Sequence, residues 1–153
     1  MSETRHVVCP HCATVNRVPV DRPAVAARCG GCHQALFSGQ PIEVDEAGFE
    51  RHVRANGIPV LLDVWAPWCG PCRTMAPAFA RAAAALEPDF RLIKLNADTA
   101  PEVTSKLGVR GIPALFLIRH GTVAAQTAGA LDTASIVAWA RRHAAQTETT
   151  SGR

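Results

Sequence analysis

All six cysteines of the chain occur in three Cys-x-x-Cys pairs, and this spacing constrains fold and chemistry more than any other feature. The pairs are Cys9/Cys12, Cys29/Cys32 and Cys69/Cys72. The first two lie among turn-forming glycines and prolines, whereas the third follows a nearly continuous apolar run. Because cytosolic thiols are kept reduced, such pairs in a chain without a secretory signal indicate metal binding or redox chemistry rather than structural disulfides. We therefore expect two kinds of site.

Length and composition exclude several classes of protein. The 153 residues, 48% of them hydrophobic and 19% charged, suffice for one domain with a core and a small satellite. The formal charge of +3 is spread along the chain without a basic block, so nucleic acid is not an expected partner. No apolar run approaches the roughly 20 residues of a membrane span. We expect a cytoplasmic protein without membrane contact, and nothing in the sequence requires more than a monomer.

The first 40 residues are predicted to form a small zinc-binding domain. They carry too little apolar sequence to fold unaided, so another element must stabilise them. The first two cysteine pairs, separated by sixteen residues, have the spacing of knuckles that close a tetrahedral site of four thiolates. Four protein ligands leave no open coordination position, which favours a structural ion. The expected ligands of one zinc ion are Cys9, Cys12, Cys29 and Cys32.

Other interpretations of these four cysteines stay open at this point. They could be unligated thiols, and His11 or His33 could replace one thiolate as a ligand. Cys29-Gly-Gly-Cys-His33 also matches the pattern of covalent haem attachment. That interpretation leaves Cys9 and Cys12 unexplained, and haem attachment usually accompanies export.

From Pro41 onward, strand-like and helix-like segments alternate. Strands are predicted over residues 42–44, 60–65, 91–96, 114–119 and 123–128. Helices are predicted after Asp45, over 72–86 with a kink at Pro77, after a capping box of Thr99 and Glu102, and after Asp132. This order predicts an α/β fold, a mixed sheet with helices on both faces. We divide the chain into residues 1–40, a larger domain over 41–146 and a polar tail over 147–153.

The third cysteine pair lies where a buried strand is predicted to end and a helix to begin. The first turn of a helix has unpaired N–H groups and a partial positive charge, which favour a thiolate at Cys69. Cys69 is the expected nucleophile and Cys72 the resolving thiol, acting through a mixed disulfide and leaving a redox-active Cys69–Cys72 disulfide. A metal half-site or two inert thiols are the alternatives.

Several motifs resemble the thioredoxin family. Trp-Cys-Gly-Pro-Cys at 68–72 looks like its active site, and four further stretches match at 60–66, 94–98, 108–113 and 129–131. The resemblance covers residues 41–146 and implies the thioredoxin fold. With the preceding knuckle pair, the chain is similar to the zinc-binding bacterial type called thioredoxin 2, in which a zinc-ribbon-like domain precedes that fold.

Asp63 is the single charged residue of the predicted strand 60–65. Desolvation should raise its pKa and let it exchange a proton with Cys72, a role that the resemblance also implies. By resemblance, Lys94 in the next inner strand neighbours Asp63 and tunes its charge. A solvent-facing aspartate and a surface lysine are the alternatives.

The resemblance also implies a surface that docks disulfide-bearing segments of other proteins. It implies a cis peptide bond before Pro113, although the trans form is favoured for X–Pro bonds in general, and a backbone at Ile112 that pairs with the substrate. The residues expected on this surface are Trp65, Trp68, Gly70, Pro71, Ile112, Pro113 and Gly129.

Together these features predict a protein-disulfide reductase. The resemblance implies thioredoxin reductase as electron donor, and the chain has no glycine-rich loop that would bind a nucleotide of its own. We also hypothesise that oxidants release the zinc and alter the reactivity of the larger domain. The alternatives are an oxidase or isomerase on the same fold, and a binding or chaperone module in which the redox pair is incidental.

Overall fold

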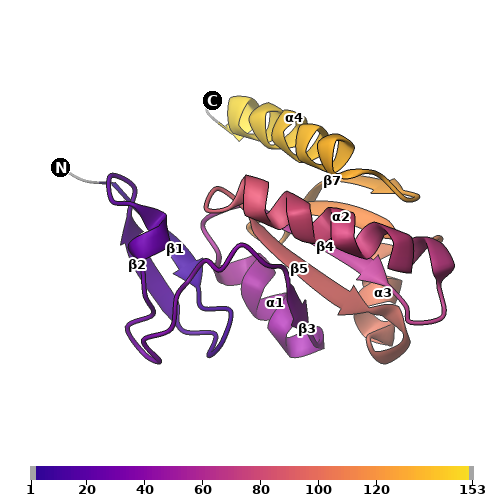
Figure 1. The fold of residues 1–153 in the computed structure, drawn as a ribbon, viewed down its shortest axis with the longest axis horizontal. Helices are drawn as coiled ribbons and strands as arrows, with labels where there is room; N and C mark the ends of the chain where they lie inside the picture. The colour runs from indigo at the N-terminus through magenta and orange to yellow at the C-terminus, as the bar shows by residue number, and fades with distance from the viewer. Residues whose placement is uncertain (1–2, 152–153) are drawn as a thin grey trace.

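The computed structural model describes residues 3–151, with side chains up to residue 146. It contains a two-stranded sheet and a five-stranded sheet, which lie side by side in Figure 1. No helix in the described part of the chain is both long enough and apolar enough for a membrane span.

The small sheet is antiparallel and consists of β1 (Thr4–Val8) and β2 (Val15–Pro19), followed by the short helix η1 (Ala24–Ala26). One Cys-x-x-Cys turn follows β1 and the other follows η1. We call residues 4–37 the ribbon and the turns at 9–12 and 29–32 the knuckles. The ribbon has a small core of its own, made of Val7, Cys9, Val18, Cys29 and Leu36.

The five-stranded sheet has the strand order β3-β5-β4-β6-β7. Its strands are β3 (Ile42–Val44), β4 (Val60–Trp65), β5 (Arg91–Asn96), β6 (Ala114–Arg119) and β7 (Thr122–Ala128). The helices between and after them are α1 (Glu46–Ala55), α2 (Gly70–Leu86), η2 (Ala97–Thr99), α3 (Pro101–Leu107) and α4 (Thr133–Ser151). β3, β5 and β4 run parallel, whereas β6 and β7 are antiparallel to their neighbours. The predicted mixed sheet is therefore confirmed, and we call the part from β3 to α4 the larger domain.

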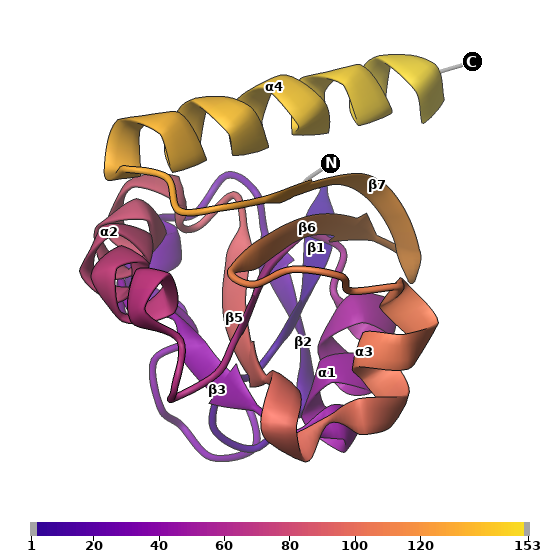
Figure 2. The ribbon, with the colours of Figure 1, turned by 90° about the vertical axis from the view of Figure 1, so that its right-hand side faces the viewer.

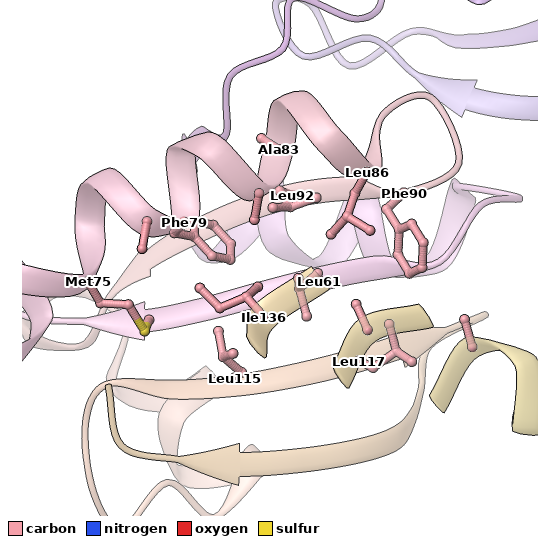
Figure 3. Close-up of a cluster of buried hydrophobic side chains, with 14 residues drawn as sticks. Leu61, Met75, Phe79, Ala83, Leu86, Phe90, Leu92, Leu115, Leu117 and Ile136 are labelled. Carbon is pink, nitrogen blue, oxygen red and sulfur yellow. The ribbon is translucent and has the colours of Figure 1, made fainter. Parts of the chain in front are cut away.

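The helices cover both faces of the sheet, as Figure 2 shows. One buried cluster joins α2 and α4 to the sheet, and Figure 3 shows Phe79 and Leu86 of α2 close to Leu92 of β5. The other cluster joins α1 and α3 to the opposite face. Side chains alternate along β4, so Leu61 belongs to the first cluster and Leu62 to the second. Asp63 consequently shares with Leu61 the face that α2 covers.

The predicted capping box before α3 is wrong. The N-cap position is Ala100, which offers no side-chain cap, and the Thr99 hydroxyl bonds the Asn96 carbonyl instead. The chain first forms η2, so Thr99 lies one residue before the N-cap position of α3. The orphan N–H groups of Glu102 and Val103 donate to the Glu46 carboxylate of α1, at 2.9 and 3.0 Å. A tertiary contact thus replaces the local cap.

Other boundaries differ slightly from the prediction. The active-site helix begins at Gly70 rather than at residue 72, because Cys69 caps it. The hairpin strand begins at Thr122. Asp132 does cap α4, where its side chain accepts the Ser135 N–H at 2.8 Å. The helix continues to Ser151, so most of the segment predicted as a polar tail is helical, and residues 152–153 lie outside the described residues.

Arg91, the first residue of β5, joins the ribbon to the larger domain. Its side chain is only 1% exposed, and its guanidinium donates to the carbonyls of Val8 at 3.1 Å and Leu36 at 2.8 Å. Glu87 pairs with it at 3.4 Å and also accepts the Gly39 N–H at 2.7 Å. One buried ion pair therefore satisfies backbone groups before the first knuckle and after the second.

Hydrogen bonds to the two residues that directly follow α1 complete this junction. The Asn56 side chain accepts the Val8 N–H at 2.8 Å, and the Gly57 N–H donates to the His6 carbonyl at 2.8 Å. Figure 1 shows the ribbon beside α1 accordingly. The ribbon is thus docked by directional hydrogen bonds, which fix its position relative to the sheet.

Candidate active site and metal site

Cys69 and Cys72 form a disulfide at the start of α2, with their Cα atoms 5.3 Å apart. Cys69 is the N-cap residue, and its sulfur accepts the Cys72 N–H at 3.2 Å. Pro71 occupies the first turn, where its missing N–H costs nothing. In the reduced protein, the same N–H and the positive end of the helix dipole would stabilise a thiolate at Cys69. The local geometry thus favours the charge distribution that thiol–disulfide exchange requires.

Asp63 is buried in β4, where its side chain is only 1% exposed. Among the described residues, its Oδ1 atom has no hydrogen-bond partner. Burial raises the pKa of Asp63 to about 7, although Lys94 opposes the shift. Lys94 is the register partner of Asp63 across β4 and β5. The structure therefore places the two residues as neighbours and gives Asp63 a pKa suited to proton exchange near neutral pH.

A small apolar cluster surrounds the disulfide. Trp65 and Ile112 pack against Cys69, Cys72 and Ala66. The sulfur of Cys69 lies 3.8 Å from the Ile112 carbonyl oxygen. These contacts bring the predicted docking residues Trp65 and Ile112 directly to the sulfur atoms.

The other predicted docking residues lie in loops or at the start of α2. Trp68 is 67% exposed, and Gly70 and Pro71 are also exposed. The Ile112–Pro113 peptide bond is cis, as the resemblance implies. Gly129 has φ +106° and donates its N–H to the Pro113 carbonyl at 2.9 Å. A side chain at this φ would be strained, which accounts for glycine here.

Two carboxylates that the sequence reasoning missed hold the tryptophans. The indole N–H of Trp65 donates to Glu43 at 3.0 Å, and that of Trp68 donates to Asp98 at 3.0 Å. Glu43 lies in β3 and Asp98 in η2, directly after β5. The sequence could have indicated both residues, because they lie near the carboxyl ends of predicted parallel strands, where binding sites of open α/β sheets form.

The four knuckle cysteines converge in the ribbon. Their sulfur atoms all lie within 4.8 Å of one another, with Cys9 and Cys32 at 3.6 Å and Cys12 and Cys29 at 3.5 Å. Zn–S bonds of about 2.3 Å in a tetrahedron place sulfur atoms about 3.8 Å apart, so the donor set fits zinc. Backbone N–H groups of His11 and Gly31 point at the sulfurs of Cys9 and Cys29, both at 3.3 Å.

Close contact shifts the pKa values of two of these thiols in opposite directions. Hydrogen bonding, chiefly from the Cys32 backbone, lowers the pKa of Cys29 to about 5. At Cys32 the Gln34 N–H lowers the pKa, but burial and the three neighbouring thiols outweigh it and raise the value to about 11. A divalent ion would remove this conflict by stabilising four thiolates at once. With four protein ligands, such an ion would have a structural role.

Comparisons with known proteins agree with this geometry. The family model described as Thioredoxin matches residues 40–142, and the one described as Thioredoxin 2, N-terminal, matches residues 8–34. Thioredoxin C-3 of Corynebacterium nephridii is 41% identical over 133 residues, which cover 87% of this chain and 91% of that protein. The thioredoxin of Rhodospirillum rubrum is 43% identical over 97 residues, covering 63% and 93%.

A solved structure gives the same result for the fold. A mutant thioredoxin from Halobacterium salinarum NRC-1 superposes with a TM-score of 0.63 at 26% identity, covering 70% of this chain and 93% of that one. The match covers most of that thioredoxin chain.

Proposed function

The chain belongs to the thioredoxin family and is a thiol-disulfide oxidoreductase, and on this premise we propose that it reduces disulfides in other proteins. The observation that carries the proposal is the position of Cys69. Its sulfur caps α2, accepts the Cys72 N–H and lies beside the apolar surface of Trp65 and Ile112. An attacking thiolate and a docking surface are thereby combined in one place.

In the proposed reaction, the Cys69 thiolate attacks one sulfur of a target disulfide. That S–S bond breaks, the second target sulfur leaves as a thiolate, and Cys69 forms a mixed disulfide with the target. The Cys72 thiol then loses its proton, and its sulfur attacks the Cys69 sulfur. This step releases the remaining target thiolate and forms the Cys69–Cys72 disulfide seen in the structure. Two electrons pass to the target and two thiols are oxidised.

We propose that Asp63 accepts the proton that Cys72 loses. Lys94 would adjust the pKa of Asp63. The pKa of about 7 supports this role, because a carboxyl group of that pKa takes up and releases protons near neutral pH. Asp63 lies on the sheet face that α2 covers, which supports this assignment. Lys94 lies one strand away and stabilises the carboxylate form.

We propose that the target docks on the exposed surface around the disulfide. Its members would be Trp65, Trp68, Gly70, Pro71, Ile112, Pro113 and Gly129. The backbone of Ile112 would pair with the target chain beside Cys69.

Members of this family generally reduce disulfide-containing proteins and are reduced by thioredoxin reductase, so we propose the same electron donor here. A reducing compartment such as the cytoplasm suits this assignment, because the four knuckle thiols must stay reduced to bind a metal.

We further propose that the chain is of the thioredoxin 2 type, with zinc in the ribbon. The domain boundaries predicted above, 1–40, 41–146 and 147–153, go with this assignment. The convergence of all four cysteines supports zinc over haem attachment, which would use only two of them. Oxidation of the thiolates would release the ion. Zinc content and reductase activity that stay constant through a peroxide titration would contradict this redox response.

The proposed reductase is tested by measuring its potential. The value known for thioredoxin is about −270 mV, against about −120 mV for a strong periplasmic oxidant. We expect a value near the lower figure from equilibration with glutathione redox buffers. A potential near the higher figure would favour the oxidase or isomerase alternative. Full function retained by a Cys69→Ser, Cys72→Ser variant would favour a binding module.

A further inference from the structure

An open groove of about 680 Å³ lies between the ribbon and the larger domain. Its ribbon side is formed by the first knuckle, and its opposite side by β3, the start of α1 and the end of β4. The lining residues used in the argument are Pro10, His11, Ala13, Glu43, Asp45 and Trp65. Figure 1 shows the ribbon beside α1, the helix that follows β3.

One residue, Trp65, belongs both to the groove and to the surroundings of the disulfide. It lines the groove and also packs against the buried cluster of Ala66, Cys69 and Cys72. Asn96, the register partner of Trp65 on β5, lines it as well. A chain bound at Cys69 can therefore pass over Trp65 into the groove without leaving the protein surface.

The groove carries fixed negative charge. Glu43 is held by the Trp65 indole N–H at 3.0 Å, and Asp45 by the Gly48 N–H at 2.7 Å. Among the described lining residues there is no lysine or arginine. Lys94 is close, with Nζ 4.9 Å from the Trp65 ring centroid, but it does not line the groove. Arg51 is also close, because its Nε donates to the carbonyl of the lining residue Ala13 at 3.0 Å, but it does not line the groove either. The lining itself therefore carries two carboxylates and no lysine or arginine, in a chain whose formal charge is +3.

We propose that this groove binds the segment flanking the reactive cysteine of a target protein, and that it favours a segment carrying lysine or arginine. The inference rests on the proposed function, because it assigns a second contact region to the same substrate. A basic segment is favoured because its charge is complementary to the two carboxylates of the groove. The flank of the reactive cysteine is favoured over an unrelated ligand because Trp65 belongs both to the groove and to the surroundings of the disulfide. The ribbon then forms one wall of the substrate site in addition to its structural role.

The test uses peptides with one cysteine in a mixed disulfide with 5-thio-2-nitrobenzoate. Attack by Cys69 on the peptide sulfur releases this coloured thiolate, so one absorbance trace gives the second-order rate constant. Lysine and glutamate are compared at each position along the flanks of the cysteine. We expect the lysine peptide to react about two- to fivefold faster at the best position, as exposed charge pairs allow. The ratio should approach one at 1 M salt, where the Debye length is about 3 Å.

Variants locate the effect in the groove. Glu43→Gln keeps an acceptor for the Trp65 indole, and Asp45→Asn keeps a capping oxygen for α1. Together they should bring the lysine-to-glutamate ratio close to one. Asp89→Asn is the matched control for each single substitution, because it removes one negative charge beside Arg5, outside the groove. His11→Lys should also lower the ratio while zinc content is unchanged.

The possible failures are distinguishable. If no peptide reacts faster than with Cys69→Ser, the proposed reductase function is wrong. If lysine and glutamate peptides react equally at every position, only the groove assignment is wrong. A preference for lysine that persists in the Glu43→Gln, Asp45→Asn variant also contradicts the groove assignment.

Discussion

Among the described residues, the larger domain has two buried clusters, one of fourteen side chains under α2 and α4 and one of twelve under α1 and α3, whereas the cluster of the ribbon has five. Two of those five are knuckle cysteines, Cys9 and Cys29. Burial of apolar area is the main favourable contribution to folding, so the larger domain has a sufficient source of stability and the ribbon does not. The comparison teaches that the two parts of one chain depend on different interactions.

The ribbon compensates in two ways, with a cluster of four thiols that fits a metal ion and with a surface docked on the larger domain. Arg91 and Asn56 satisfy backbone groups of the ribbon from the larger domain. The active site, in contrast, uses only elements of the larger domain. Unfolding of the ribbon should therefore weaken the contacts that the ribbon makes with a substrate and with the larger domain. It should affect the disulfide chemistry less.

Metal removal should produce the largest difference in stability between the ribbon and the larger domain. Structural zinc in small peptides contributes about 10–16 kcal/mol of apparent binding free energy, far more than the ribbon core can supply. We expect a strong chelator to abolish the amide hydrogen-exchange protection of β1 and β2 while β4 and β5 stay protected. Exchange resolved by mass spectrometry measures both regions in one sample. Metal-free protein with protected β1 and β2 would contradict the comparison.

The larger domain carries a cost of its own at Asp63. Its folded pKa of about 7 exceeds the ordinary 3.8, so between pH 4 and 7 the folded state holds a proton that the unfolded state has lost. The contribution of Asp63 to the free energy of unfolding therefore falls by about 4 kcal/mol as pH rises through this range. Above it, this contribution stays constant. Asp63→Asn should remove this loss, so the variant should be more stable than the native chain at pH 8 and similar at pH 4.

Urea titrations at the two pH values, with the disulfide intact, measure the difference. Asp98→Asn is a suitable comparison, because Asp98 is exposed and should change stability little at either pH. Equal stability of native chain and Asp63→Asn at pH 8 would contradict the buried, proton-binding carboxyl group.

A smaller effect is expected at the junction between the two parts. Arg91→Met leaves the Glu87 carboxyl group buried without its partner, and breaking such a pair costs about 3 kcal/mol. We expect weaker exchange protection in the ribbon but unchanged zinc content. The Arg91→Met, Glu87→Met double variant should regain part of the loss, since no charge then stays buried. Arg54→Ala breaks the exposed pair with Glu50 and should cost less than about 1 kcal/mol.

The sequence predicted those features that depend on local pattern. The spacing of the knuckles brings four cysteine sulfurs together, and any charge inside the apolar run 60–65 is buried. The cysteine cluster and the buried position of Asp63 could therefore be predicted. The alternation of strands and helices likewise predicted the order of elements and the mixed sheet.

The features that were missed depend on tertiary contacts. Arg91 begins a strand, a position where arginine is usually solvated, and only the docked ribbon explains its burial. The Thr99 capping box failed because η2 shifts the helix start and Glu46 of a distant helix supplies the acceptor. The helical end of α4 was missed because residues 146–151 lack an apolar face in the sequence, and the helix continues past Ala144, the last buried residue among those whose side chains the structure describes.

The central claim is that Cys69 is the nucleophile of a disulfide reductase whose zinc site is separate from it. Insulin disulfide reduction with dithiothreitol as electron donor, with bound zinc quantified in the same samples, tests it most directly. We predict that Cys69→Ser abolishes turnover and retains about one zinc per chain, as the native chain does. Equal turnover in the native chain and Cys69→Ser would contradict the claim.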